Sequence, residues 1–479
     1  MYKVDSKQTV DIIEISQQKV LSNFLLYAHK IPAYIKFLSD QKINISDIKN
    51  IDDFNRLPYT NQENYIELFS LKDRSIDPTK ITQILSSSGS SGKPHYWAQD
   101  ENLDMSIAAD FKSRIEKDID NIDNIDTILG IVTAGMGVWG AGGLMSRVFR
   151  ILSQELDSFQ FITPGLDIDE NMKILEHYVK KEKINTLVLI GYTSSTKDII
   201  DIAKEKNLIK NINIYAYVGG DILSNEIRKR VESIIGKGRL KSLYAASEVG
   251  IMAIDNDYTP ELKLIMEQRL NENEIEKIFN TKYIPSIYQY NPNKHFFQVS
   301  ENGLIVITDF TSNTPLIRYT LNDNGGIITS NKLEEYIKEK IPNFKPKDKN
   351  PFIFISSKKD VVLSFYSVKI PSFHIQSSIQ SEELLSLISG KFRAYQELDP
   401  NGNPIFKLHL ELSPNLSYSQ ISKNDEKFIK ETFVRNLRKI NGEYNKLISS
   451  IKEKAVPQII LEEFGPDNSF KTKNKIKQV

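Results

Sequence analysis

Short apolar runs alternate with amphipathic helical patterns along residues 128–250. The apolar runs read TILGIVT, NTLVLIGY, NINIYAYVGG and LKSLYAASEVG, and the helical patterns between them read ENMKILEHYVKK, TKDIIDIAKEK and SNEIRKRVESIIG. Strand–helix alternation of this kind is typical of a parallel sheet covered by helices. Ligands of such sheets bind beyond the carboxyl ends of the strands, so the glycine-rich and polar ends of these runs are candidate walls of a site.

The rest of the chain follows other patterns. Residues 8–40 are predicted to be helical, and Thr60 with Glu63 is predicted to form a capping box. After about residue 285, NGLIVITDF and PLIRYTLNDNGGIIT are predicted to be antiparallel strands joined by turn residues. We therefore expect an α/β protein. Its large N-terminal domain, residues 1–357, would hold parallel and mixed sheets covered by helices, and a small α+β C-terminal domain would span residues 358–479.

Composition narrows the classes of function. Lys plus Arg and Asp plus Glu both number 62, so no overall field attracts nucleic acid or an anionic membrane. The absence of cysteine excludes disulfides, thiolate zinc sites and a cysteine nucleophile. We see neither a signal peptide nor an apolar run of the ~18 residues that a membrane span needs, and we expect a cytoplasmic protein. The scattered histidines form no HExxH pair, so we expect no structural metal site.

The segment ILSSSGSSGKPHYW, residues 84–97, has the composition of an anion-binding loop. Its serines and glycines expose backbone N–H groups and hydroxyls, and Lys93 adds a positive charge, so phosphate is the natural ligand. It is not the commonest phosphate loop, because Gly89 and Gly92 are too close and Pro94 replaces the magnesium-binding hydroxyl. A flexible Ser/Gly linker is the alternative. The short length, the Lys-Pro ending and the adjacent HYW favour the binding loop.

This segment, as SSGSSGKP, resembles the phosphate loop of the adenylate-forming superfamily of acyl- and aryl-CoA synthetases. GMGVWGAGG, YVGGD, YAASEVG and PLIRYTLND follow in the order of that family, and the N-terminal YAHKIPAYIKFLSDQKI and IDDFNRLPYTNQENY resemble the phenylacetate–coenzyme A ligase branch. The resemblance implies an acid–thiol ligase that uses ATP and Mg²⁺. A carboxylate would attack the α-phosphate of ATP, and coenzyme A or the phosphopantetheine of a carrier protein would displace AMP. It also implies an N-terminal adenylation domain and a mobile C-terminal lid.

The resemblance assigns roles to individual residues. Lys93, Glu248 and Lys475 would be catalytic, with Glu248 as the magnesium ligand and Lys475 beside the α-phosphate. Lys473 is the alternative to Lys475, and a solvated basic tail is the rival for both. Asp323 would accept hydrogen bonds from the ribose hydroxyls, although its neighbours also suit a turn. The other nucleotide-binding residues implied are Ser87, Ser88, Gly89, Ser90, Ser91, Gly92, Gly219, Gly220, Asp221, Tyr244 and Ser247. Arg318 is either structural or phosphate-facing.

An acyl pocket is implied by the same resemblance. Its residues are apolar and partly aromatic, which suits an aryl or short hydrophobic acid better than an amino acid. These residues are Met136, Val138, Trp139, Tyr192, Ala245, Ala246 and Met252. Each of them could instead belong to the core.

The domain junction departs from the family. Lys359 falls at the hinge position, but Ser356 and Ser357 replace Gly-Arg, and Tyr366 replaces the glycine that admits the pantetheine arm. The acceptor therefore stays open among coenzyme A, a carrier-protein thiol, an amine and a partner protein. A non-catalytic nucleotide-binding relative is the alternative from another class.

Overall fold

We describe the chain from a computed structural model. The described residues are 7–87, 95–136, 140–220, 223–256, 258–281, 284–339, 341–342, 349–358, 362–365, 368–398, 404–465, 470–472 and 475–476. Two compact units are present: Met1–Lys117 with Leu243–Lys358, called here the first unit, and Asp118–Ser242 with Lys359–Val479, the second unit. The expected α/β class is confirmed, with a large mixed sheet covered by helices and a smaller C-terminal sheet. The functional domains 1–357 and 358–479 stay a prediction.

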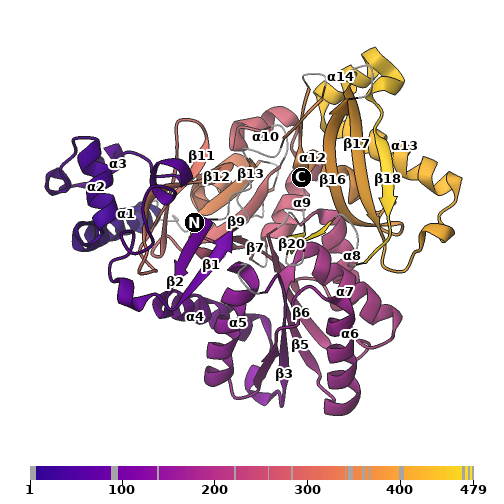
Figure 1. Ribbon diagram of the computed structural model, residues 1–479, viewed down its shortest axis with the longest axis horizontal. Coiled ribbons are helices and arrows are strands. Elements are labelled where there is room, and N and C mark those ends of the chain that lie inside the picture. The colour runs from indigo at the N-terminus through magenta and orange to yellow at the C-terminus, as the bar shows by residue number, and fades with distance from the viewer. Residues whose placement is uncertain are drawn as a thin grey trace. The chain divides into compact units, whose positions relative to one another are not determined.

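The first unit combines N-terminal helices with antiparallel strands (Figure 1). Its sheet has the order β10-β11-β12-β13-β9-β8-β7, and β7 (Leu240–Ala246) belongs to this unit from Leu243 onward. A separate hairpin pairs β1 with β2. The elements are α1 (Lys7–Tyr27), α2 (Pro32–Asp40), α3 (Ile51–Arg56), β1 (Gln83–Ser87), β2 (His95–Gln99), α4 (Glu101–Asp118), β8 (Gly250–Ile254), α9 (Thr259–Arg269), α10 (Glu272–Phe279), β9 (Ser286–Tyr290), β10 (His295–Val299), β11 (Leu304–Asp309), β12 (Leu316–Ile328), α11 (Ser330–Ile337) and β13 (Phe352–Lys358).

The predicted antiparallel strands in NGLIVITDF and PLIRYTLNDNGGIIT are confirmed as β11 and β12. The segment from Asn322 to Gly325, which also suits a turn, lies within the single long strand β12. The strand stays continuous by local distortion: Arg318 and Asn322 have left-handed φ angles of 47° and 58°, and the register on β13 shifts after Asn324. At Gly325 an added Cβ would lie 2.0 Å from the carbonyl oxygen of Phe354. Glycine therefore serves close strand packing here and not a turn.

The N-terminal helix also differs from the expectation, since it is broken between α1 and α2. Pro32 begins α2 and cannot donate the hydrogen bond that would continue α1. Thr60 does not cap a helix either, because its hydroxyl donates to the carbonyl of Ile317 at 2.8 Å. The capping residue is Asn61, which accepts from the backbone N–H of Asn64.

Arg318 has a structural role. Its side chain is 4% exposed, and its guanidinium lies 4.5 Å from the ring centre of Tyr59. Its carbonyl accepts from the backbone N–H of Thr60 at 3.0 Å. Burial lowers the pKa of Arg318, and the neighbouring Tyr59 and Tyr34 partly oppose this. Arg318 thus ties the segment after α3 to β12.

The second unit begins with parallel strands in the order β6-β5-β3-β4, of which β3, β5 and β6 were predicted and β4 was not. Helices cover both faces: Leu129 and Leu187 pack in one cluster with residues of α6, α7 and α8, whereas an added Cβ on Gly130 would meet the ring of Phe149 in α5 (Figure 1). The elements are β3 (Ile128–Thr133), α5 (Gly140–Glu155), β4 (Phe159–Ile162), α6 (Ile168–His177), β5 (Thr186–Tyr192), α7 (Thr193–Glu205), β6 (Asn213–Gly219) and α8 (Asn225–Ile235).

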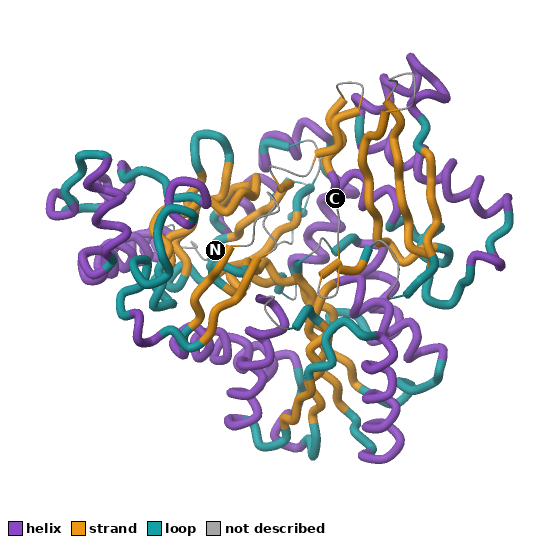
Figure 2. Tube along the Cα trace, viewed as in Figure 1, coloured by secondary structure: helices purple, strands orange, loops and turns teal. Residues whose placement is uncertain are grey.

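The C-terminal part of the second unit is an α+β arrangement, as expected. Strands β16, β17 and β18 form its sheet, with β17 and β18 parallel (Figure 2). Phe392, Phe406 and Phe433 belong to its core. The elements are β14 (Val362–Phe365), β15 (Val368–Pro371), α12 (Ser372–Ile379), β16 (Ile388–Leu398), β17 (Pro404–Leu412), α13 (Lys423–Ile440), α14 (Gly442–Ile451), β18 (Gln458–Glu462), β19 (Lys471–Thr472) and β20 (Lys475–Ile476).

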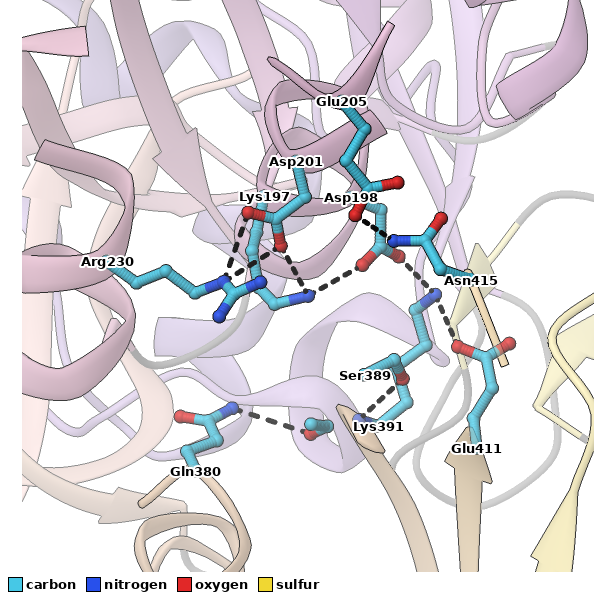
Figure 3. Close-up of polar contacts among 11 residues, drawn as sticks. Lys197, Asp198, Asp201, Glu205, Arg230, Gln380, Ser389, Lys391, Glu411 and Asn415 are labelled. Carbon is cyan, nitrogen blue, oxygen red and sulfur yellow. Dashed lines mark hydrogen bonds and ion pairs between the residues drawn. The ribbon is translucent and has the colours of Figure 1, made fainter. Parts of the chain in front are cut away.

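A buried network of charges joins the two sequence segments of the second unit (Figure 3). Lys391 of β16 lies 3.0 Å from Asp198 of α7 and 2.7 Å from Glu411 of β17. Lys197 lies 2.9 Å from Asp198 and 3.3 Å from Asp201. Arg230 of α8 completes the network by donating to both oxygens of Asp201, shown at the left of Figure 3. Three cations thus face three carboxylates, and Arg230 is the member of the network that is partly exposed, at 35%.

Within the part of the chain described above, no helix combines the length and the apolar character that crossing a bilayer requires.

Candidate functional site

The structure brings together two residues from separate predicted motifs, Tyr244 and Asp323. The hydroxyl of Tyr244 donates to Oδ2 of Asp323 at 2.7 Å, although 79 residues separate them in the sequence. Both side chains are 8% exposed. Tyr244 lies near the end of β7, and Asp323 follows the left-handed Asn322 in β12. Burial and the charge of Asp323 raise the pKa of Tyr244 well above its ordinary value. The tyrosine therefore stays protonated and acts as the donor.

Ser247 and Glu248 lie beside this pair, in the turn between β7 and β8. Both are partly exposed. Burial is the main cause of the raised pKa values of Tyr244 and Tyr319, and the charge of Glu248 raises both further. The negative charge of Glu248 thus acts on both tyrosines.

Two tyrosines of this region were not named as site residues from the sequence, although Tyr319 lies within the motif PLIRYTLND. Tyr288 of β9 stacks on Tyr244, with ring centres 5.8 Å apart and an angle of 24° between the rings. Tyr319 of β12 packs edge-on against Trp97 at 6.1 Å. Tyr288 and Tyr319 are buried, so each reads in the sequence as a core residue of a strand. Their place beside the site depends on strand order, which the local sequence does not reveal.

The predicted pocket residues of the first unit differ in burial. Ala245 is exposed, Ala246 is partly buried, and Met252 of β8 is 3% exposed. Met252 belongs to the same core cluster as Tyr244 and Tyr288, and Ala246 packs against that cluster. Met252 is thus a core residue, which was the alternative for every pocket residue.

The predicted phosphate loop connects β1 to β2. Ser87 ends β1 and pairs with His95 at the start of β2. The rest of the loop lies outside the described residues, as do two pocket residues, the hinge lysine and an aspartate. These are Ser88, Gly89, Ser90, Ser91, Gly92, Lys93, Val138, Trp139, Lys359 and Asp221. Their roles stay predictions.

Four predicted site residues that the structure describes lie in the N-terminal segment of the second unit, Asp118–Ser242. Tyr192 ends β5 and pairs in register with Gly219 of β6. Gly220 has a left-handed φ of 84°, and an added Cβ there would lie 2.8 Å from the ring of Tyr192. A side chain at position 220 would therefore be strained and would clash with that ring. Met136 is partly buried, and its sulfur lies 2.7 Å from where an added Cβ on Gly142 would be.

Lys475 lies in β20, where it pairs with Thr472 of β19. The tail is thus a short antiparallel pair at this point, which a freely solvated tail would not form. Lys473 lies outside the described residues. The choice between the two lysines stays open.

A magnesium ion would need oxygen ligands. In the described residues no group of three or more His, Cys, Asp or Glu side chains could hold a metal ion by itself. Mg²⁺ usually keeps several waters and binds one or two carboxylates together with substrate phosphates. The partly exposed carboxylate of Glu248 fits that kind of site, and a site made of protein ligands alone has no support.

Comparisons with known proteins find similar structures only. No family model matches the chain, and no curated protein matches it. One similar solved structure is the amide bond synthetase McbA from Marinactinospora thermotolerans, with 8% identity, a TM-score of 0.44, and coverage of 84% of this chain and 68% of that one. Another is the anthranilate CoA ligase AuaEII in complex with anthranoyl-AMP, with 11% identity, a TM-score of 0.48, and coverage of 83% and 66%.

A third similar structure is the acyl-CoA synthetase (AMP-forming)/AMP-acid ligase II-like protein from Dyadobacter fermentans DSM 18053. It has 12% identity and a TM-score of 0.34, with coverage of 82% of this chain and 87% of that one. The matches thus include adenylate-forming enzymes. At TM-scores below 0.5 the likeness decides neither the activity of this chain nor its branch.

Proposed function

We propose that the chain is an adenylate-forming ligase that activates a carboxylic acid with ATP. A carboxylate oxygen attacks the α-phosphorus of ATP, the bond to the β-phosphate breaks, and pyrophosphate leaves. A thiolate then attacks the acyl carbon, and AMP leaves with the electrons of the broken carbon–oxygen bond. The observation that carries the proposal is the hydrogen bond between Tyr244 and Asp323, because it unites two nucleotide-binding motifs that are 79 residues apart.

In the proposed site, Asp323 binds the ribose hydroxyls. A carboxylate is a hydrogen-bond acceptor, and the hydrogen bond from Tyr244 shows that Asp323 acts as one here. Gly219 and Gly220 let a flat base approach the backbone, since the left-handed Gly220 carries no side chain. Asp221, which follows Gly220 in the sequence, would belong to the same nucleotide-binding segment.

The phosphate roles follow the sequence motifs. The loop from Ser87 to Lys93 would donate hydrogen bonds to the departing pyrophosphate, and Lys475 would neutralise the charge that builds up at the α-phosphate. Ser247 would donate to the same phosphate. Glu248 would hold Mg²⁺, which supplies positive charge to the phosphates when bound.

We propose an aryl or small hydrophobic acid as the substrate. Met136, Tyr192, Ala245 and Ala246 would line its pocket together with Val138 and Trp139. The acceptor is proposed to be the thiol of coenzyme A or of a carrier protein. Residues 1–357 would bind both substrates, and residues 358–479 would act as the lid, with Lys359 as the hinge.

The test is ATP–pyrophosphate exchange over a panel of benzoic, phenylacetic and short aliphatic acids. We expect exchange with at least one acid, its loss in Lys475→Ala, and a higher Mg²⁺ requirement in Glu248→Gln. The control is Lys427→Ala, because Lys427 is exposed on α13 and lies outside the proposed site. Binding of ATP without exchange for any acid would replace this proposal with a non-catalytic nucleotide-binding role. Once an acid is known, adding coenzyme A, a carrier protein or an amine identifies the acceptor.

A further inference from the structure

We infer that Tyr244 is a positioning residue: its hydroxyl fixes the carboxylate of Asp323 in the orientation that accepts the two ribose hydroxyls. This inference rests on the proposed function and changes the role of Tyr244. The resemblance names that tyrosine only as one of several nucleotide-binding residues. In the structure, Tyr244 instead holds Asp323, the residue that is proposed to bind the ribose.

The local backbone shows why Asp323 depends on a partner. Asn322 is left-handed, and the pairing of β12 with β13 shifts register just after Asn324. The carboxylate therefore lies on an irregular piece of strand, where regular strand geometry does not fix the side-chain direction. The 2.7 Å hydrogen bond from Tyr244 fixes one oxygen, Oδ2, and so limits rotation of the whole carboxylate.

The tyrosine is itself held in place. Its ring stacks on Tyr288, which is 7% exposed and lies in the neighbouring part of the sheet. An aromatic side chain has two side-chain torsions, and a stacked, buried ring leaves its hydroxyl in a fixed position. Because Tyr244 stays protonated, the hydrogen bond always runs from the tyrosine to the carboxylate. Charge-assisted hydrogen bonds of this kind are about twice as strong as neutral ones.

The test compares the dissociation constants of ATP and 2′,3′-dideoxy-ATP by calorimetry, which requires no turnover. The wild type should prefer ATP, and Asp323→Asn should lose most of that preference. Tyr244→Phe keeps the stacked ring and removes only the hydroxyl. We expect it to weaken ATP binding about tenfold while leaving dideoxy-ATP binding unchanged. In the exchange assay the same variant should raise KM for ATP without lowering kcat.

The matched control is Tyr290→Phe, since Tyr290 is a buried tyrosine of the same strand as Tyr288 and lies against Phe297. It should leave the preference for ATP unchanged. An unchanged preference in Tyr244→Phe, together with a lost preference in Asp323→Asn, would overturn the positioning role and leave the proposed function standing. Equal binding of the two nucleotides by the wild type would overturn both the inference and the ribose role of Asp323. A loss of affinity for both nucleotides in Tyr244→Phe would show a general structural role and contradict the inference.

Discussion

Nζ of Lys391 and Oδ2 of Asp198 lie 3.0 Å apart, although 193 residues separate the two in the sequence. Neither side chain is more than 2% exposed. Taking two charges out of water is costly unless each is paired and hydrogen-bonded, and the network around this pair meets that condition. The residues after Lys358 are therefore fastened to helix α7 within the second unit by ionic contacts that water does not screen.

Removing the central cation should destabilise the second unit. Lys391→Met removes the cation that contacts both Asp198 and Glu411, so the three carboxylates of the network are left with two of its three cations. Breaking a buried pair in this way costs about 3–5 kcal/mol of unfolding free energy. Thermal unfolding of the variant should begin well below that of the wild type. The matched control is Lys427→Met, whose ion pair with Glu431 is exposed and is worth about 0–1 kcal/mol. Equal unfolding temperatures for the two variants would contradict the network's role.

The same network sets a pH window. Burial alone would raise the pKa of Asp198, but the charges of Lys197 and Lys391 together lower it below the ordinary 3.8. Burial alone would lower the pKa of Lys391, but Asp198 and Glu411 raise it above 10.5. Because the pKa of Asp198 is lowered, this aspartate stabilises the fold above pH 3.8, and its contribution is lost as the pH falls further. Because the pKa of Lys391 is raised, this lysine stabilises the fold below pH 10.5, and its contribution is lost as the pH rises further. Lys391→Met should therefore cost most between these limits, as unfolding measured across pH would show.

His374 should weaken the fold in mild acid. Its ring is 9% exposed and lies 3.1 Å from Nδ2 of Asn441, and burial lowers its pKa to about 4 from 6.5. The folded protein binds a proton at His374 more weakly than the unfolded chain does. The free energy of unfolding therefore falls as the pH drops from 6.5, the ordinary pKa of histidine, to about 4. The loss amounts to about 3 kcal/mol. His374→Gln should flatten the pH profile of unfolding in this range, whereas replacing the exposed His177 by Gln should not. A variant profile parallel to the wild type would contradict the assignment.

The strand that carries Asp323 should not tolerate a side chain at Gly325. The Cβ of Gly325→Ala would lie 2.0 Å from the carbonyl oxygen of Phe354, a contact that forces β12 and β13 apart. We expect a loss of more than about 3 kcal/mol of unfolding free energy and weaker nucleotide binding. Gly442→Ala is the control, because nothing lies within 4 Å of the added Cβ there. It should change stability by no more than about 1 kcal/mol. A tolerated Gly325→Ala would show that the close strand packing is unimportant.

The sequence predicted the parallel part of the fold well, because its signals are local. The strands β3, β5, β6 and β7 are apolar runs, and the predicted helices α6, α7 and α8 have a helical apolar pattern. Helix α5 and strand β4 were not predicted. The strand β12 was predicted, but the sequence left a turn open within it, since Asn-Asp-Asn-Gly-Gly is also good turn chemistry. Close packing of Gly325 and Gly326 against Phe354 makes these glycines strand residues. Thr60 was missed as well, because its hydroxyl bonds to a carbonyl 257 residues away.

Some residues of the candidate site could be predicted from the sequence, and others could not. Motif residues such as Tyr244, Glu248 and Asp323 could be named from the sequence, and the structure brings the first and the last into contact. Tyr288 could not be named, because it enters the site only through the order of strands β9, β8 and β7. The charge network of Lys391 could not be predicted either, since each of its charged residues has the sequence context of an ordinary surface residue.

The central claim is that a carboxylate oxygen of the substrate attacks the α-phosphorus of ATP. The most direct measurement uses the acid found by exchange, labelled with heavy oxygen in its carboxylate, together with ATP, Mg²⁺ and the acceptor. Mass spectrometry of the nucleotide product then follows the label. The account predicts AMP that carries one heavy oxygen atom from the acid. Label in inorganic phosphate with ADP as the nucleotide product, or AMP without label, would contradict it.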